Sequence, residues 1–381
     1  MADKKDISYK RLLSKTLSYL GIVGLNPLAH TKASDIKAVV ILTLEVLLTF
    51  SIAASFSINL SEPYAIIENF TGFAPAVQIV YRKIMLLMHR SDFRDIINYL
   101  DYFWSINAFG KHTANQVIRI QKMQSKFLKF YLWTVILSGI AYVAKPAFTD
   151  ERELPVLSIN ICPIKTSSAC YLGSYAFQSS CIAVLLCHIV LLDSLFLNLL
   201  LYGYCELEQI KYAFHEVKAE VHVHDEEPKV LQLTILIKHH IKVLEYFDKL
   251  NKLFSLMLLF QFSSSLCSLC TGLFMLTSNR SPPSSSFALK FVSYVISALI
   301  QIFAYCLAGQ MILEQNESIT ASAYFNCKWW EAYQPKLRKG ICLIIQRSQR
   351  PVNIVAGGLW KLEMDMFVKI VKGSFSLLTF M

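Results

Sequence analysis

The stretch YLGSYAFQSSCIAVLLCHIVLLDSLFLNLLLY, residues 171–202, decides the fold class of this chain. It exceeds the roughly 20 apolar residues that an α-helix needs to cross the hydrocarbon core of a bilayer. Three more segments are similarly apolar, over residues 38–60, 253–277 and 287–313. The sequence therefore predicts an all-α integral membrane protein.

Three weaker segments complete the predicted set of spans. They cover residues 64–88, 127–148 and 352–381, and each carries charge or proline. The composition agrees with seven spans, because 54% of the 381 residues are hydrophobic and only 17% are charged. Soluble domains carry roughly 25% charged residues. The mean hydropathy is +0.43, so much of the chain is expected to be buried in lipid.

Lysine and arginine are distributed unevenly over the connections between these spans. The N-terminal segment and the connections after spans two, four and six hold 27 of them, and the other three connections hold 5. Cytoplasmic loops carry such an excess, so the N-terminus is predicted to be cytoplasmic and the C-terminus extracellular. This topology and the anionic inner leaflet account for the net charge of +10 without a nucleic-acid partner.

The last predicted span carries a polar stripe. Its members are spaced four, three, four and three residues apart, which places them on one face of a helix: Asp365, Lys369, Lys372, Ser376 and Thr379. Ionisable groups at membrane depth usually face a bundle interior or a water-filled cavity. The stripe either lines a pore, which one subunit is too small to enclose, or is paired off within the bundle, as Asp365 and Lys369 could be.

The C-terminal region resembles that of insect odorant receptors. The similarity rests on RSQRP at 347–351, AGG at 356–358, MDMF at 364–367 and IVKGSFS at 370–376. The chain departs from the family pattern at Phe375, where tyrosine is usual, and at Met381, where leucine is commoner. The motif is degenerate and covers about 35 residues, but chain length, seven spans and a cytoplasmic N-terminus agree with it over the whole chain.

This resemblance implies a subunit of a tetrameric, ligand-gated, non-selective cation channel with the insect odorant receptor fold. Residues 1–313 would hold the first six spans and the odorant pocket, 314–350 a cytoplasmic anchor region, and 351–381 the pore-lining helix. The chain lacks a long insertion between spans four and five, so it resembles a tuning subunit that assembles with the common co-receptor, Orco. A multi-pass protein of the plasma membrane, in the dendrites of olfactory neurons, is expected, with membrane lipid and a small volatile odorant as further partners.

The resemblance also places an odorant pocket in the outer half of spans two to six. Such a pocket should be enclosed and mainly apolar. Side chains at that level are the ligand-binding candidates: Phe70, Phe73, Val77, Tyr142, Tyr175, Phe177, Gln178, Phe274, Phe291 and Tyr294. Aromatic residues at helical spacing also serve as packing residues, so either role stays open for each of them.

Other patterns point away from catalysis. The sequence holds no phosphate-binding loop, nucleophile elbow or paired catalytic carboxylates, so we expect no enzyme, cofactor or metal. His222 and His224 are interpreted as part of a solvated loop. Cys162 and Cys170 share one outer loop and could pair, and Glu45 lies in the first span without an assigned role.

Three rival classes fit the sequence less well. A G-protein-coupled receptor has the opposite topology, and a transporter often shows inverted repeats that are not seen here. A gustatory receptor shares the expected fold, but its last-helix signature is missing from FSLLTFM at 375–381.

Overall fold

The computed structural model describes residues 11–29, 31–58, 63–144, 146, 152–159, 162–217, 219, 226–277, 285–331 and 333–380. Each of the seven predicted spans contains a helix: α3 (Lys32–Ile58), α4 (Pro63–Met88), α6 (Gly110–Val143), α7 (Ser168–Ala213), α8 (Glu227–Thr277), α9 (Ser285–Asn326) and α11 (Met364–Phe380). Within the described residues, α3, α6, α7, α8 and α9 are long and apolar enough to cross a membrane by themselves.

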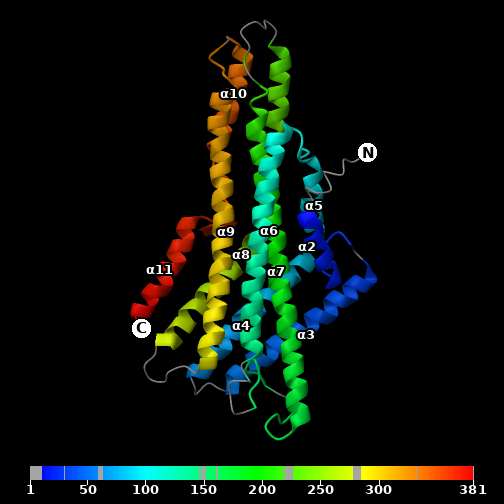
Figure 1. Cartoon of the computed structure of the whole chain (residues 1–381), viewed down its shortest axis with the longest axis vertical. Helices are drawn as coiled ribbons and strands as arrows, with labels where there is room; N and C mark the ends of the chain where they lie inside the picture. Colours follow the sequence, from blue (N-terminus) through cyan, green and yellow to red (C-terminus); the bar gives the residue numbers. More distant parts are fainter. Residues whose placement is uncertain are drawn as a thin grey trace.

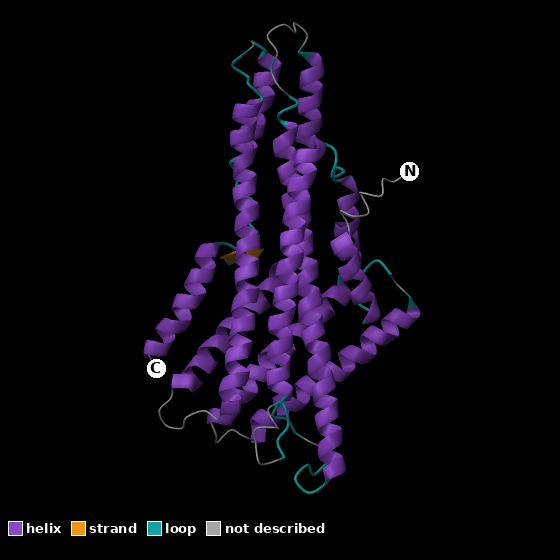
Figure 2. Cartoon of the chain, in the orientation of Figure 1, coloured by secondary structure: helices purple, strands orange, loops and turns teal. Residues whose placement is uncertain are grey.

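Shorter elements lie between these helices. They are α2 (Arg11–Ile22), α5 (Arg90–Tyr99), the 3-10 helix η1 (Leu100–Tyr102), α10 (Pro335–Ser348) and the strands β1 (Val355–Ala356) and β2 (Trp360–Lys361). Figure 2 shows how completely helices dominate the chain, with the strand pair beside α9. The fold class predicted from the sequence, an all-α membrane protein, is confirmed.

The molecule is elongated (Figure 1). α6, α7 and α9 stand nearly parallel, whereas α3 and α4 cross the lower part of the bundle at an incline. At 1.5 Å per residue the 46 residues of α7 are about 69 Å long, more than twice the thickness of a hydrocarbon core. The long helices must therefore extend well beyond the bilayer.

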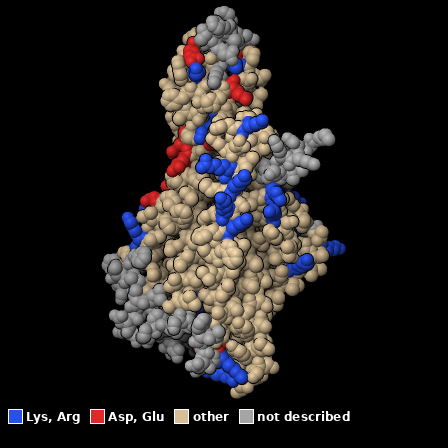
Figure 3. All heavy atoms as spheres, in the orientation of Figure 1, with Lys and Arg blue, Asp and Glu red and all other residues tan. Residues whose placement is uncertain are grey.

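Charge on the surface indicates which part lies in lipid. In the view of Figure 3, Lys, Arg, Asp and Glu gather over the upper and middle parts of the molecule, and the broad lower part is largely uncharged apart from its bottom end. The ends of α7, α8 and α9 that extend past the bilayer form the upper part, which the topology predicted from the sequence places in the cytoplasm. A continuous apolar core holds the bundle together, and Phe196, Leu199 and Leu250 are almost fully buried in it.

The predicted start of the last span is wrong. Its helix, α11, begins at Met364 and not at Val352, because residues 352–363 form the β1–β2 hairpin instead. Gly357 and Gly358 have φ angles of 60° and 72°, a left-handed backbone that a right-handed helix does not contain. The hairpin docks on α8, where the Gly357 N–H donates to the carbonyl of Ser255 at 2.9 Å.

The outer connection before α7 is covalently closed. Cys162 and Cys170 form a disulfide with their Cα atoms 6.0 Å apart, which settles the pairing that the sequence left open. Pro75 lies inside α4, and the helix continues through it.

Candidate ligand-binding cavity and last helix

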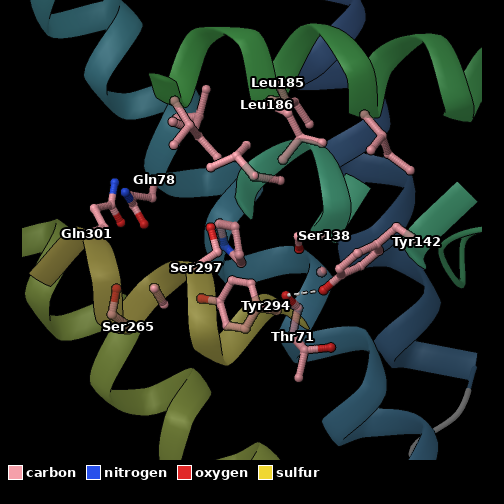
Figure 4. A pocket seen from close by; sticks show the side chains of 18 of the residues that line it. Thr71, Gln78, Ser138, Tyr142, Leu185, Leu186, Ser265, Tyr294, Ser297 and Gln301 are labelled. Atoms are coloured by element: carbon pink, nitrogen blue, oxygen red, sulfur yellow. Dashed lines mark hydrogen bonds between the residues drawn. The ribbon is translucent and has the colours of Figure 1, made fainter. Parts of the chain in front are cut away.

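A cavity of about 100 Å³ lies in the lower part of the bundle, between α3, α4, α6, α7, α8 and α9. Figure 4 shows side chains from several of these helices converging on it. Most of its wall is aliphatic and comes from all of them except α8: Leu48, Ile52, Ala76, Ile79, Val135, Ile182, Leu185, Leu186, Ile189 and Ala298. Enclosure by apolar side chains with a few polar groups is typical of sites for small organic ligands.

A loop segment covers one side of this cavity. Val156 is part of the cavity wall, and its backbone N–H donates to Oε1 of Gln178 at 3.0 Å. The Gln178 amide in turn donates to Ser158 Oγ at 2.7 Å. On the other side, Ser51 Oγ donates to the carbonyl of Ile159 at 2.8 Å. The segment is therefore fastened to both α7 and α3 over the cavity.

The opposite end of the cavity is polar, and its lining residues Gln261 and Gln301 contact a buried ion pair. Arg82 of α4 contacts Asp193 of α7 at 2.7 Å, and both side chains are almost completely buried. The carboxylate also accepts the hydroxyl protons of Tyr131 at 2.6 Å and Tyr305 at 2.5 Å. Five helices contribute to this end once Gln261 of α8, which accepts from Arg82, is included. Such extensive pairing is what a charge needs in order to remain ionised away from water.

A second buried charge cluster lies beside the first. Glu45 of α3 forms an ion pair with Lys83 of α4, and His188 of α7 lies 3.2 Å from the same carboxylate. The connection after the second span was counted over residues 82–126, so it took Arg82 and Lys83 as cytoplasmic, and that placement is wrong. Both are less than 5% exposed because acidic side chains on neighbouring spans pair with them inside the bundle.

Two of the ten candidate ligand contacts, Tyr142 and Tyr294, line the cavity. The Tyr142 hydroxyl donates to the carbonyl of Thr71 at 3.5 Å (Figure 4). Phe73 packs against the ring of Phe56 beside the cavity.

The other candidates lie outside the cavity lining. Phe70 and Val77 are half-buried, Tyr175 donates to the carbonyl of Val143, and Phe177 is 41% exposed. Phe274 is half-buried, and Phe291 is buried against Gly272. Whether any of the ten touches a ligand stays a prediction.

Sequence reasoning missed the aliphatic wall of the cavity and also several polar residues of its lining. Gln78, Tyr131, Ser138, Gln261 and Gln301 line the cavity, and none was a candidate. A usable signal was present, because isolated polar and charged residues within apolar spans usually face a bundle interior.

The polar stripe of α11 lies on its exposed face. Asp365 and Lys369 form an ion pair at 2.6 Å with about two thirds of each side chain exposed. Lys372 and Ser376 are exposed as well, and the side chain of Thr379 lies outside the described residues. The opposite face holds the helix in place, where Ile370 is buried and Phe367 packs against Phe303. The expected pair thus forms, but on a surface that faces away from α8 and α9.

Comparisons with known proteins agree on one family. The sequence model described as 7tm Odorant receptor matches residues 62–375. Odorant receptor 10 of Aedes albopictus is 22% identical over 302 residues, 79% of each chain. Odorant receptor 13a of Drosophila melanogaster is 23% identical and covers 87% of this chain and 83% of its own.

A solved structure shares the fold. The olfactory receptor OR5 of Machilis hrabei, in complex with eugenol, superposes with a TM-score of 0.84 at 15% identity, over 99% of this chain and 98% of that one. Family, fold and membrane-spanning helices therefore lead to one conclusion: this multi-pass membrane protein belongs to the insect 7tm odorant receptor family.

Proposed function

We propose that this chain is the odorant-binding subunit of a heteromeric, ligand-gated, non-selective cation channel. A volatile, mostly apolar odorant would enter the cavity between α3 and α9 and open the channel. The mainly apolar cavity carries this proposal. Its volume of about 100 Å³ is of the same order as the roughly 150 Å³ apolar cavity that takes up benzene. No enzymatic activity is assigned to it.

The last helix supports the channel part of the proposal. A polar, charged face on a membrane helix needs water or a partner, and a single α11 is too little to enclose a pore. We therefore assign α11 to a shared pore in a tetramer with the co-receptor, Orco. The region 314–350 would anchor the subunits, and it exposes the aromatic side chains of Trp330 and Tyr333.

α8 and α9 connect the two parts. Both helices contribute side chains to the cavity, Gln261 from α8 and Gln301 from α9, and both pack against α11. An odorant that shifted either helix would therefore reach the pore helix directly. It could open the channel only by binding the open arrangement more tightly than the closed one. The protein would act in the plasma membrane of olfactory neuron dendrites, surrounded by lipid.

Two-electrode recording in oocytes tests this function. The chain is expressed with and without the co-receptor and exposed to volatile esters, ketones, aldehydes and alcohols. We expect an odorant-evoked cation current that requires both chains and persists when G-protein signalling is blocked. Robust current from this chain alone would contradict the heteromeric assignment. A surface-expressed pair that answers none of the volatiles would contradict the receptor function itself.

A further inference from the structure

The buried ion pair at the polar end of the cavity fixes the direction of a chain of glutamine side chains. An arginine can only donate hydrogen bonds, and an ionised aspartate can only accept them. Arg82 Nη1 lies 3.4 Å from Gln261 Oε1, so this amide presents its oxygen to the arginine. Gln301 must present its nitrogen to Asp193 Oδ2, to which it donates. The amide orientations therefore follow from charge.

The remaining contacts agree with these orientations. Gln261 Nε2 donates to Gln301 Oε1 at 2.5 Å and to Ser265 Oγ at 3.3 Å. Gln261 Oε1 also accepts from Gln78 Nε2. Gln261 thus uses both amide protons and both oxygen lone pairs, and it has no hydrogen-bonding capacity left for a ligand.

Gln78 and Gln301 keep unused donor capacity. The Gln78 amide donates one hydrogen bond to Gln261 and accepts one from Ser264 Oγ at 2.7 Å. The Gln301 amide donates one hydrogen bond to Asp193. The second N–H of each side chain has no hydrogen-bond acceptor among the residues that the structure describes. Both side chains line the cavity and are 6% exposed.

Buried donors of this kind favour a particular ligand. An unpartnered buried N–H costs more than an unused lone pair on a carbonyl oxygen. The two amides lie at one end of the cavity, and the aliphatic side chains of Leu185 and Leu186 form a different wall (Figure 4). A complementary molecule has an apolar body with one hydrogen-bond acceptor at its end.

We infer that Gln78 and Gln301 form a hydrogen-bond donor site that selects small odorants with a carbonyl oxygen, such as aldehydes and ketones, over hydrocarbons of the same shape. This inference rests on the proposed function, since it assigns a chemical class to the ligand of that cavity. The ion pair of Arg82 with Asp193 acts as a positioning device, because it holds the amides with their N–H groups available.

Isosteric ligand pairs test the inference. Benzaldehyde and styrene differ by a carbonyl oxygen in place of a methylene group, and acetophenone and α-methylstyrene form a second such pair. In oocytes that express the chain with its co-receptor, each carbonyl compound should act at a roughly tenfold lower concentration than its hydrocarbon, as one hydrogen bond to a buried donor implies. Stabilisation of the purified complex against heat by the same compounds measures binding without a variant.

Gln78→Met identifies the donor. The variant removes one of the two free N–H groups at similar size, so the preference for the carbonyl compound, measured as the ratio of the effective concentrations of benzaldehyde and styrene, should fall several-fold. Ser180→Ala is the matched control, because it removes a polar group from the exposed face of α7, away from the cavity lining and the glutamine chain. It should leave the ratio between the two ligands unchanged.

The outcomes separate the inference from the function that it presupposes. Hydrocarbons as potent as their carbonyl partners, or a Gln78→Met variant that weakens both equally, would overturn the donor site and leave the receptor assignment standing. The same holds if the volatiles that activate the complex lack an acceptor oxygen. Absence of both current and heat stabilisation with every volatile tested would overturn the proposed function, and the inference with it.

Discussion

Arg82 and Asp193 illustrate how much depends on single residues in this bundle. Each is buried, and together with Tyr131 and Tyr305 they join four helices. The net stability contributed by such a pair is small, because desolvation offsets the attraction between the charges. Removing one partner is different, since it leaves an uncompensated charge away from water.

Asp193→Asn should therefore be strongly destabilising. We expect a loss of roughly 3–5 kcal/mol, the usual cost of breaking a buried pair. It should be measured as a lowered unfolding temperature of the purified complex and as reduced surface expression. The double variant Arg82→Met with Asp193→Asn carries no buried net charge and should recover much of that loss.

Lys328→Ala provides the control for the single variant. Lys328 pairs with Glu331 at 2.8 Å, but both side chains are more than a third exposed, so little change is expected. A double variant that is as unstable as the sum of its two single variants would contradict the charge-pair explanation.

Residue roles were the least predictable part of the molecule. Tyr142 and Tyr294, which line the cavity, were among the candidates because the family resemblance directs attention to aromatic residues in the outer half of the spans. Gln78 and Gln301 were missed, although each is a polar residue in an apolar helix. Periodicity identifies the face of a helix, but it gives neither the depth of the cavity nor the partner on another helix.

The junction between α9 and the backbone that leads into α11 is a close contact. Gly309 of α9 faces the backbone just before α11, and a Cβ built on it would lie 2.1 Å from the carbonyl oxygen of Leu362. That oxygen belongs to backbone tied into the hairpin, because the Leu362 N–H donates to the carbonyl of Ile354 at 2.8 Å. The close approach thus sets how α11 leaves the bundle.

Gly309→Ala should displace this junction. Overpacking against backbone typically costs 1–3 kcal/mol, so a lower unfolding temperature and an altered odorant sensitivity are expected. Gly173→Ala on α7 is the matched control, since nothing lies within 4 Å of its added Cβ. It should be neutral or stabilising by up to about 1 kcal/mol, the helix-propensity gain of alanine over glycine. Equal effects of the two substitutions would show that the Leu362 contact does not constrain α11.

Elements were predicted better than their ends. All seven spans contain helices, because long apolar runs have few alternatives in a membrane. The helices α7 and α8 extend far past the predicted spans, since polarity ends a span without ending a helix. The start of α11 was misplaced because Gly357 and Gly358 turn the chain within an otherwise apolar segment.

At the scale of the whole molecule, the cavity and α11 belong to one connected bundle. α8 and α9 line the cavity at one level and hold α11 at another. On the face that Figure 3 shows, charged side chains gather over the upper and middle parts, and the lower part is largely uncharged apart from its bottom end. This distribution accords with the cytoplasmic N-terminus predicted from the lysine and arginine count.

The central claim is that an odorant in this cavity opens the channel, and filling the cavity tests it most directly. Ala298 is buried in the cavity wall on α9, whereas Ala183 lies on the exposed face of α7. Odorant-evoked current should be recorded for Ala298→Val, Ala298→Phe and Ala183→Phe, each co-expressed with the co-receptor and checked for surface expression. We expect sensitivity to fall with Ala298→Val, to vanish with Ala298→Phe, and to persist with Ala183→Phe. A surface-expressed Ala298→Phe complex with unchanged odorant sensitivity would contradict the account.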